Sequence, residues 1–245
     1  MSANAALIIP ALDEEVVIAR TLAAVPRELF RQIIVADNGS RDRTAQIALD
    51  AGATVVTEPV RGYGAACLRA IASLDEGIDA VVFMDADSSD DPRQAALLLE
   101  PISGGRADLV IGSRTLGRAE PGSLQPHQVF GNRLATFLMR ILYGYRYTDL
   151  GPFRAIRAGA LAQLGMRDRN YGWTIEMQIK AVQAGLRIVE VPVDYRRRVG
   201  ISKVSGNWSA SLRAGVKILW TVFRLWRARA PPTAAAGTSK YGSRR

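Results

Sequence analysis

Two carboxylates one residue apart, Asp85 and Asp87, directly follow the apolar run at 80–84. An apolar run of this length before a polar turn predicts a buried strand. Ligand sites of open parallel sheets lie just outside the carboxyl ends of the strands. Paired carboxylates there suit a hard divalent cation, Mg²⁺ or Mn²⁺, which takes oxygen ligands and leaves positions for a substrate's phosphates. The alternative is a polar turn that caps a helix starting at Asp91-Pro92.

The elements that would position these carboxylates alternate along the chain. Strand-like apolar runs occur at 6–9, 32–36, 54–57, 80–84, 107–111 and 188–193, and helical patterns at 14–23, 44–51, 64–73, from Pro92, 129–143, 158–165 and 174–184. This rhythm predicts a single α/β domain with a mostly parallel central sheet and helices on both faces. The first strand-to-helix turn reads PALDEE instead of G-x-G-x-x-G, which argues against a nicotinamide or flavin enzyme.

Composition and charge limit the possible ligands and sites of the protein. The 245 residues are 48% hydrophobic and carry a formal net charge of +9, with no acidic residue after Asp194. The basic C-terminal end could face phosphates, nucleic acid or an anionic bilayer. The single Cys67 excludes an internal disulfide and fits a reducing compartment, and the single His127 argues against a zinc site.

The termini and the hydrophobic runs predict the domain organisation and the location. The first residues carry no basic n-region, so no signal peptide is predicted, and no apolar run is long enough for a spanning helix. We expect a catalytic domain at 1–205, a basic amphipathic helical segment at 206–230 and a disordered tail at 231–245. The expected location is the cytoplasm.

Several motifs in this order resemble the inverting family 2 glycosyltransferases, whose GT-A fold is a Rossmann-like nucleotide-sugar domain. The stretches at strand ends are PALDEE (10–15), ADNGSRDRT (36–44), RGYGAA (61–66) and DAD (85–87). Later stretches, GSR (112–114), DLGPFR (149–154), WTIE (173–176) and RVGISK (198–203), sharpen the resemblance toward the polyprenyl- and dolichyl-phosphate mannose or glucose synthases. The resemblance covers roughly residues 5–205.

The resemblance implies a donor site for a GDP-mannose or UDP-glucose type of nucleotide sugar. Its residues would be Pro10, Ala11, Glu14, Asp37, Gly39, Gly64 and Asp85. Carboxylates suit this work because they accept hydrogen bonds from base N–H groups and sugar hydroxyls. Asp37 could also form an Asx turn with Asn38-Gly39. Gly62 and Gly64 would bring backbone N–H groups at a helix start near the donor, although such glycines usually serve only a turn.

Within the same resemblance, Asp85 and Asp87 would hold the Mg²⁺ or Mn²⁺ ion that assists departure of the nucleotide diphosphate. The sequence departs from the mannosyl enzymes at one position. Where they commonly carry a metal-ligating Gln, this chain has Ser89, so water or Asp90 could supply the third ligand.

The acceptor implied by the resemblance is polyprenyl phosphate. Arg114, Arg133, Arg198 and Lys203 match basic positions around the lipid phosphate, and Asp149 and Glu176 would order that site. Arg and Lys suit phosphate as a planar fork of donors and a compact charge. A phosphate monoester is already anionic, so alignment and charge stabilisation suffice for attack on the anomeric carbon. Asp149 could serve as a base toward a hydroxyl acceptor.

The segment from Trp208 to Arg229 mixes aromatic and aliphatic residues with Arg and Lys at helical spacing. This composition is typical of a helix in the interface of an anionic bilayer. It predicts a peripheral enzyme on the inner face of the cell membrane, or one recruited by a membrane-protein partner. The alternative is a packed helix or an oligomer contact.

Two other functions compete with this prediction. One is transfer to a soluble acceptor, such as a phosphorylated small acid or a cell-wall glycan. The other is a non-catalytic nucleic-acid binder, which the acidic 85–91 segment and the lack of a nucleic-acid motif disfavour. We therefore expect no nucleic-acid partner. The sequence identifies neither the sugar nor the base.

Overall fold

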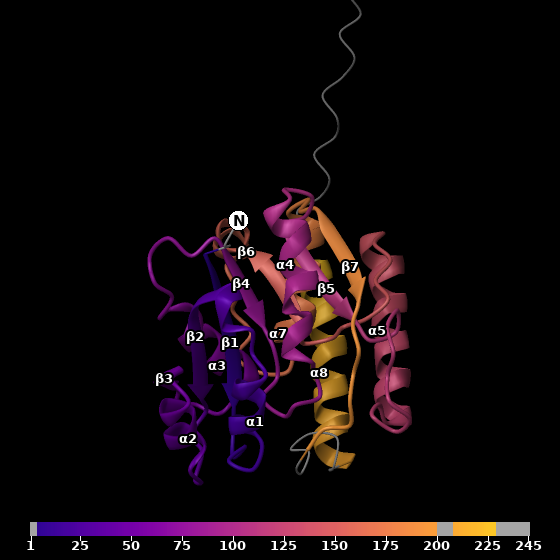
Figure 1. The fold of residues 1–245 in the computed structure, drawn as a ribbon. Helices are drawn as coiled ribbons and strands as arrows, with labels where there is room; N and C mark the ends of the chain where they lie inside the picture. Colours follow the sequence, from indigo (N-terminus) through magenta and orange to yellow (C-terminus); the bar gives the residue numbers. More distant parts are fainter. Residues whose placement is uncertain (1–3, 200–207, 229–245) are drawn as a thin grey trace, which may run out of the picture.

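The computed structural model in Figure 1 describes residues 4–199 and 208–228, and from 208 to 214 the backbone only. The expected site residue Lys203 and the expected disordered tail at 231–245 lie outside the described residues. The strands are β1 (Ala5–Ala11), β2 (Phe30–Asp37), β3 (Thr54–Thr57), β4 (Ala80–Phe83), β5 (Leu109–Ser113), β6 (Arg154–Arg157) and β7 (Ile188–Pro192). The helices are α1 (Ile18–Ala23), α2 (Thr44–Asp50), α3 (Tyr63–Ile71), α4 (Ala95–Ser103), α5 (Pro126–Tyr143), α6 (Ala158–Leu164), α7 (Trp173–Gln183) and α8 (Trp208–Arg227), with 3-10 turns at Arg27–Leu29 and Pro92–Gln94.

The strands form one sheet in the order β3-β2-β1-β4-β6-β5-β7. The pairs of β1 with β2 and β4, of β2 with β3 and of β5 with β7 are parallel. Only β6 runs against its neighbours, in the slot between β4 and β5. The predicted α/β class with a mostly parallel sheet is confirmed.

The sequence did not predict β6. Its four residues, Arg154 to Arg157, are charged at both ends and show no apolar run. They form a strand that pairs with β4 on one side and with β5 on the other. Val82 pairs with Ala155, and Val110 pairs with the same residue from the other side.

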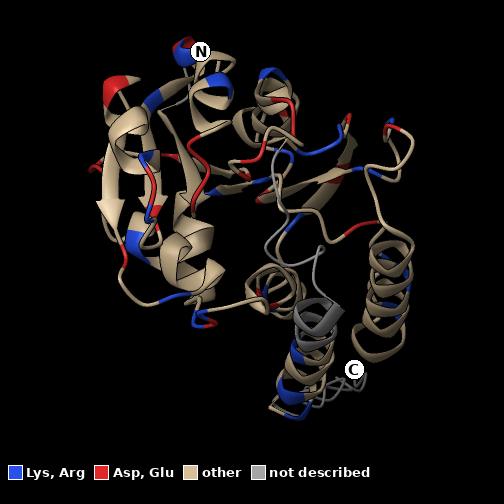
Figure 2. Ribbon diagram, turned by 90° about the horizontal axis from the view of Figure 1, so that it is seen from below, with Lys and Arg blue, Asp and Glu red and all other residues tan. Residues whose placement is uncertain are grey.

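Two apolar layers cover the two faces of the sheet. One face packs against α1, α2 and α4, through residues such as Ile18 and Leu98. The other packs against α3, α5, α6, α7 and α8, through residues such as Met139 and Val222. Figure 2, which looks along the strands from below, shows α5 and α8 on this second side of the sheet. Helices on both faces are thus confirmed.

The C-terminal helix α8 is part of this second layer. Thr221 and Val222 are fully buried. The hydroxyl of Tyr143 on α5 donates to the carbonyl of Val222 at 2.6 Å. Within the described residues, no helix is long and apolar enough to cross a bilayer.

Candidate active site

The carboxyl ends of β1, β2 and β4 meet around a pocket of about 310 Å³. It is lined by Pro10, Ala11, Leu12, Glu14, Asn38, Arg61, Gly62, Tyr63, Ala66, Asp85, Ala86, Asp87, Asn170, Tyr171 and Arg198. Parallel strands bring their ends to one edge of a sheet, so segments distant in sequence converge there. The predicted carboxylates therefore lie in a pocket that could hold a ligand.

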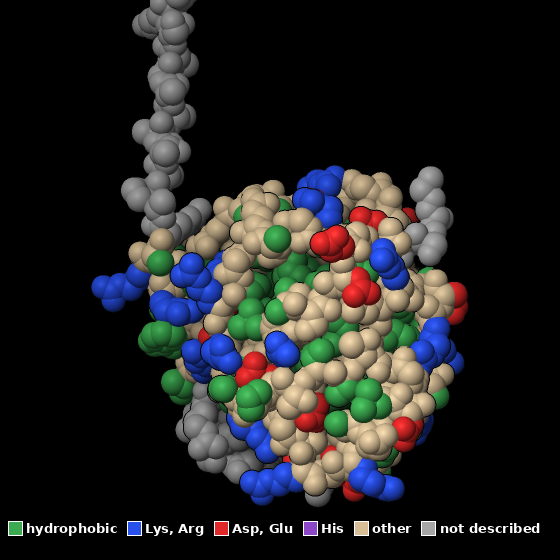
Figure 3. Space-filling model, turned by 90° about the vertical axis from the view of Figure 1, so that its left-hand side faces the viewer, with side chains coloured by type: hydrophobic (Ala, Val, Ile, Leu, Met, Phe, Trp, Pro, Cys, Tyr) green, Lys and Arg blue, Asp and Glu red, His purple; other side chains and the backbone are tan. Residues whose placement is uncertain are grey.

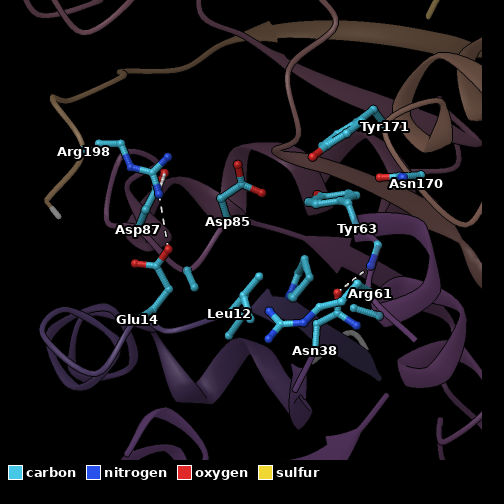
Figure 4. A pocket seen from close by; sticks show the side chains of 15 residues that line it. Leu12, Glu14, Asn38, Arg61, Tyr63, Asp85, Asp87, Asn170, Tyr171 and Arg198 are labelled. Atoms are coloured by element: carbon cyan, nitrogen blue, oxygen red, sulfur yellow. Dashed lines mark hydrogen bonds and ion pairs between the residues drawn. The ribbon is translucent and has the colours of Figure 1, made fainter. Parts of the chain in front are cut away.

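Asp85 lies near the middle of this pocket, between a charged end and an aromatic end (Figure 4). Its Oδ1 atom is buried and has no hydrogen-bond partner among the described residues. Burial raises the pKa of Asp85 to about 7, and the negative charge of Asp87 adds to the rise. A buried, unpaired carboxylate oxygen is costly unless a cation or a donor reaches it.

Asp87 is held in place by its own turn. Its Oδ1 accepts the backbone N–H of Ser89 at 3.0 Å and also the Ser89 hydroxyl. Ser89 is fully buried. The residue at the family's Gln position thus orients a carboxylate here.

The fit of a divalent cation rests on Asp85 and Asp87. Asp90 is also buried, and burial followed by the charge of Asp85 raises its pKa well above the usual range. Within residues 4–199 and 208–228, no three Asp, Glu, His or Cys side chains are grouped as a metal site. Two carboxylates, one with an unpaired oxygen, fit Mg²⁺ or Mn²⁺, because such ions commonly combine one or two carboxylates with substrate phosphates and water.

The charged end of the pocket is organised by Arg198 (Figure 4). One terminal nitrogen of its guanidinium lies 3.2 Å from Oε1 of Glu14 and 3.4 Å from Oδ2 of Asp87. Its Nε is buried and has no hydrogen-bond partner in the described part of the chain. The tertiary fold thus places a cation with an unused N–H beside two acidic side chains.

The expected donor residues divide into two groups. Pro10, Ala11 and Glu14 line the pocket, whereas Asp37 does not. Both carboxylate oxygens of Asp37 lie 3.3 Å from the backbone nitrogen of Ser40 and accept its N–H, so the side chain closes the turn through Asn38-Gly39 one residue further on than the Asx turn considered as the alternative. Its role in holding the donor stays a prediction.

Asn38 lines the pocket, whereas the adjacent Asp37 does not. Its amide donates to the carbonyls of Glu58 and Val60 and accepts the N–H of Gly62 at 2.7 Å. Asn38 therefore ties the end of β2 to the loop before α3. The signal in the sequence was present, since Asn38 stands within the ADNGS motif.

The glycines of the RGYG motif allow two backbone segments to touch. A Cβ on Gly64 would lie 2.0 Å from the carbonyl oxygen of Asp168, and one on Gly62 would lie 2.1 Å from that of Arg169. The N–H of Ala65 donates to the Arg169 carbonyl at 2.9 Å. Gly64 thus acts through the segment at 168–171, and its predicted contact with the donor remains untested. Gly39, also expected in the donor site, has a left-handed φ of 77° and accepts from Arg61 at 2.8 Å.

Sequence reasoning gave no role to the side chains at the aromatic end of the pocket. Tyr63 is the first residue of α3 and Arg61 lies in the loop before it, and Asn170 and Tyr171 come from the turn before α7. The first pair stands inside a recognised motif, but only its glycines were interpreted. Asn170 and Tyr171 carried no spacing signal, because their turn is brought to the pocket by long-range contacts, among them the close approach of the backbone at 168–169 to Gly62 and Gly64.

Of the expected acceptor residues, Arg114 and Asp149 form a closed pair. Nε and a terminal nitrogen of Arg114 each lie 2.7 Å from an oxygen of Asp149, which also accepts the Arg114 backbone N–H. The guanidinium lies 5.0 Å from the centre of the Tyr195 ring. Tyr195 forms a β-bridge with Asp90, which ties the pair to the acidic segment at 85–91.

Arg198, also expected at the acceptor site, lines the pocket, whereas Arg133 and Glu176 lie elsewhere. Arg133 is exposed on α5 and does not line the pocket. Glu176 is buried and accepts the backbone N–H groups of Arg167 and Asp168. It therefore orders the segment that carries Asn170 and Tyr171.

Comparisons of the sequence with known proteins point to glycosyltransferases. The family model named Glycosyl transferase family 2 matches residues 6–165. A protein of Mycobacterium tuberculosis named as an uncharacterized glycosyltransferase is 37% identical over 210 residues, covering 85% of this chain and 93% of that protein. The undecaprenyl-phosphate mannosyltransferase of Micrococcus luteus is 31% identical over 216 residues, or 82% of this chain and 87% of that protein.

A solved structure shares the fold. Glucosyl-3-phosphoglycerate synthase from Mycobacterium tuberculosis, crystallised with Mn²⁺, UDP and glucosyl-3-phosphoglycerate, superposes with a TM-score of 0.73 at 24% identity. The match covers 94% of this chain and 81% of that chain. At this identity the likeness establishes the fold.

Proposed function

The chain belongs to glycosyl transferase family 2, and from that premise we propose that it transfers a hexose from a nucleotide-diphosphate sugar to polyprenyl phosphate with inversion. One observation carries the proposal. The pocket is lined by the carboxylates of Asp85 and Asp87 and by the guanidinium of Arg198, and among the described residues Oδ1 of Asp85 and Nε of Arg198 have no hydrogen-bond partner, so the pocket offers carboxylates for a cation and a guanidinium for a phosphate. The lipid acceptor in the name of the 31% identical Micrococcus luteus relative supports the choice of acceptor.

The donor would lie along the pocket from its aromatic end to its charged end. Asn38, Asn170 and the two tyrosines offer hydrogen bonds and aromatic rings for the nucleoside. Asp85 and Asp87 would hold Mg²⁺ or Mn²⁺, which when bound stabilises the charge of the nucleotide diphosphate that leaves. The Mn²⁺ and UDP in the crystals of the structural neighbour support this arrangement.

The acceptor phosphate would contact Arg198 at the charged end. Arg198 lies between Glu14 and Asp87 and lines the pocket, so its guanidinium can donate to a phosphate oxygen that enters there. That oxygen forms the new bond to the anomeric carbon as the bond to the nucleotide diphosphate breaks. Because the attacking oxygen is already anionic, the chain needs to align and neutralise it but not to remove a proton.

A hydroxyl acceptor, as in a phosphorylated small acid, is the second candidate and has the name of the structural neighbour in its favour. It would need a base. Asp149, the residue considered for that role, has both carboxylate oxygens engaged by Arg114 and is fully buried. This arrangement favours the phosphate acceptor.

A screen of radiolabelled nucleotide hexoses tests the proposal. The full-length protein is incubated with Mn²⁺ and either detergent-dispersed polyprenyl phosphate, the unphosphorylated polyprenol, or 3-phosphoglycerate. We expect label in the organic phase with polyprenyl phosphate alone, and none with Asp87→Asn. Label that stays in the aqueous phase and requires 3-phosphoglycerate would overturn the lipid acceptor.

A further inference from the structure

We propose that α5 and α8 together form a surface that docks on an anionic lipid bilayer. We call this surface the two-helix face, and define it by Phe130, Phe137 and Ile141 on α5 and Val216, Trp220, Phe223 and Trp226 on α8. A membrane-docking surface is useful to the enzyme if its acceptor is a lipid, so the inference rests on the proposed function. Its test does not use the acceptor. It extends the expected interfacial segment at the C-terminus by a second helix from within the catalytic domain.

Large apolar side chains on this face are exposed to an unusual degree. Its seven members are between 44% and 68% exposed. Single exposed apolar residues are common on protein surfaces, whereas a group on adjoining helices marks an interaction site. The two helices adjoin, because the Tyr143 hydroxyl of α5 donates to the Val222 carbonyl of α8.

The exposed side chains follow helical spacing and lie opposite the buried ones. On α5, Phe130, Phe137 and Ile141 recur at intervals of seven and four residues, while Ala135 and Met139 are buried on the other side. On α8, the exposed residues from Val216 to Trp226 recur at intervals of three or four, while Thr221 and Val222 are buried. Each helix is therefore anchored in the domain by one stripe and presents a second stripe outward.

The charged residues of the two helices themselves are all basic, although Lys217 is paired with Asp168 of the turn before α7. Neither α5 nor α8 contains an Asp or Glu, whereas α5 carries Arg133 and Arg140. On α8, the Trp220 ring lies 5.0 Å from Lys217 Nζ and 4.8 Å from the Arg224 guanidinium carbon. The side of the molecule at the β3 edge instead shows acidic and basic side chains interspersed (Figure 3).

Charge complementarity selects the bilayer among possible occupants. Trp, Phe and aliphatic residues bordered by Arg and Lys match the boundary between acyl chains and anionic headgroups. A second copy of the chain would bring the exposed arginines of α5 and α8 together, with no acidic residue on either helix to offset them. The segment after Arg227 has no acidic residue either, so it offers this face no opposite charge.

Binding to vesicles without polyprenyl phosphate or donor tests the proposal. Full-length protein is sedimented with extruded vesicles of pure phosphatidylcholine or of phosphatidylcholine with phosphatidylglycerol. We expect partitioning to the anionic vesicles that weakens as salt rises, because exposed charges are screened. Point variants are needed, since truncation of α8 would also remove its buried stripe from the core.

Two paired variants separate the helices. Phe137→Ser with Ile141→Ser changes α5, and Trp220→Ser with Phe223→Ser changes α8. Each pair should lower the vesicle partition coefficient about tenfold or more, because bilayer burial of large apolar side chains supplies the binding energy. The matched control is Leu49→Ser with Leu97→Ser, two exposed leucines on α2 and α4 across the sheet, which should bind as the wild type does.

The outcomes decide the inference. Unchanged binding of the α5 pair, with a thermal midpoint like that of the wild type, would overturn the two-helix face. Vesicle-independent dimerisation that both pairs abolish would identify a second copy as the occupant and overturn the bilayer. Sugar transfer to detergent-dispersed polyprenyl phosphate by a pair that no longer sediments would uphold the face and the proposed function separately. If the wild-type protein transfers no sugar to polyprenyl phosphate in detergent but still binds the vesicles, the proposed function is wrong and the two-helix face stands.

Discussion

Lys217 on α8 and Asp168 in the turn before α7 form an ion pair, with 3.0 Å between Nζ and Oδ2. The other Asp168 oxygen accepts the backbone N–H groups of Asn170 and Gly172. Asn170 lines the donor pocket. One buried carboxylate thus links the C-terminal helix to the pocket wall.

Replacement of Lys217 by Met should therefore lower stability and loosen the pocket. It removes the charge paired with a buried carboxylate, but Lys217 is about one-third exposed, so we expect a loss of about 1–2 kcal/mol in the free energy of unfolding. Urea denaturation measures this, and calorimetry should show weaker nucleotide-diphosphate binding. The exposed Arg227→Met on the same helix is the control, and equal effects of both variants would contradict the link.

Gly64→Ala should disturb the same segment at 168–171, which Gly64 contacts from α3. The new Cβ would lie 2.0 Å from the Asp168 carbonyl oxygen, so backbone must move. We expect a loss of about 1–3 kcal/mol, as in other overpacked sites, together with weaker donor binding. Gly131→Ala in α5 has open space around it and should gain roughly 0.5–1 kcal/mol. A Gly64→Ala protein as stable as the wild type would refute the close approach.

Asp87→Asn should abolish sugar transfer while the protein stays folded. The amide keeps the size of the side chain but cannot neutralise a divalent cation. EDTA should inactivate the wild type reversibly, with recovery on addition of Mn²⁺ or Mg²⁺. Mn²⁺ binding by electron paramagnetic resonance gives a readout independent of turnover. Full activity of the variant in excess EDTA is the result that would remove the cation from this site.

Arg198→Ala should act on the acceptor more than on the donor. A charged hydrogen bond to phosphate contributes about 1.5–3 kcal/mol. Its loss should lower kcat or raise the KM for the acceptor, so that kcat/KM falls by about one to two orders of magnitude. Its neighbour Arg197, which donates to the carbonyl of Pro121, provides the matched control Arg197→Ala. If only nucleotide-diphosphate affinity falls, Arg198 belongs to the donor site instead.

Stability without metal should depend on pH through Asp85. Its pKa is raised from 3.8 to about 7 in the folded state, so the unfolded chain ionises first as pH rises. The native state therefore loses stability relative to the unfolded state between these values, and the loss is complete above about pH 7. Below the lower value both states are protonated and the effect vanishes.

Asp85→Asn should remove this cost. Its gain over the wild type in EDTA should grow between pH 5 and pH 8, toward an upper bound of about 4 kcal/mol at about 1.4 kcal/mol per pKa unit. Urea denaturation at the two pH values measures the gain, with the exposed Glu76→Gln as control. The same gain at both values would mean that Asp85 is not protonated in the native state.

The sequence by itself determined the alternation of strands and helices and the motifs at the strand ends. Each apolar run is local, and parallel strands bring their ends to one edge of the sheet, so Pro10, Glu14, Asp85 and Asp87 could be expected together. It also predicted the amphipathic character of α8, because helical spacing is written in consecutive residues.

Only the tertiary structure decided which side chains meet across long separations. Arg114 pairs with Asp149, Arg198 reaches Glu14, and Lys217 reaches Asp168, although no local pattern links these residues. The short strand β6 is defined by its pairing with β4 and β5, which are distant from it in the sequence. Likewise, α8 was expected to lie in a bilayer interface, with a packed helix or an oligomer contact as the alternative. The structure buries one of its stripes in the core and leaves the opposite stripe exposed, because a helix has room for both.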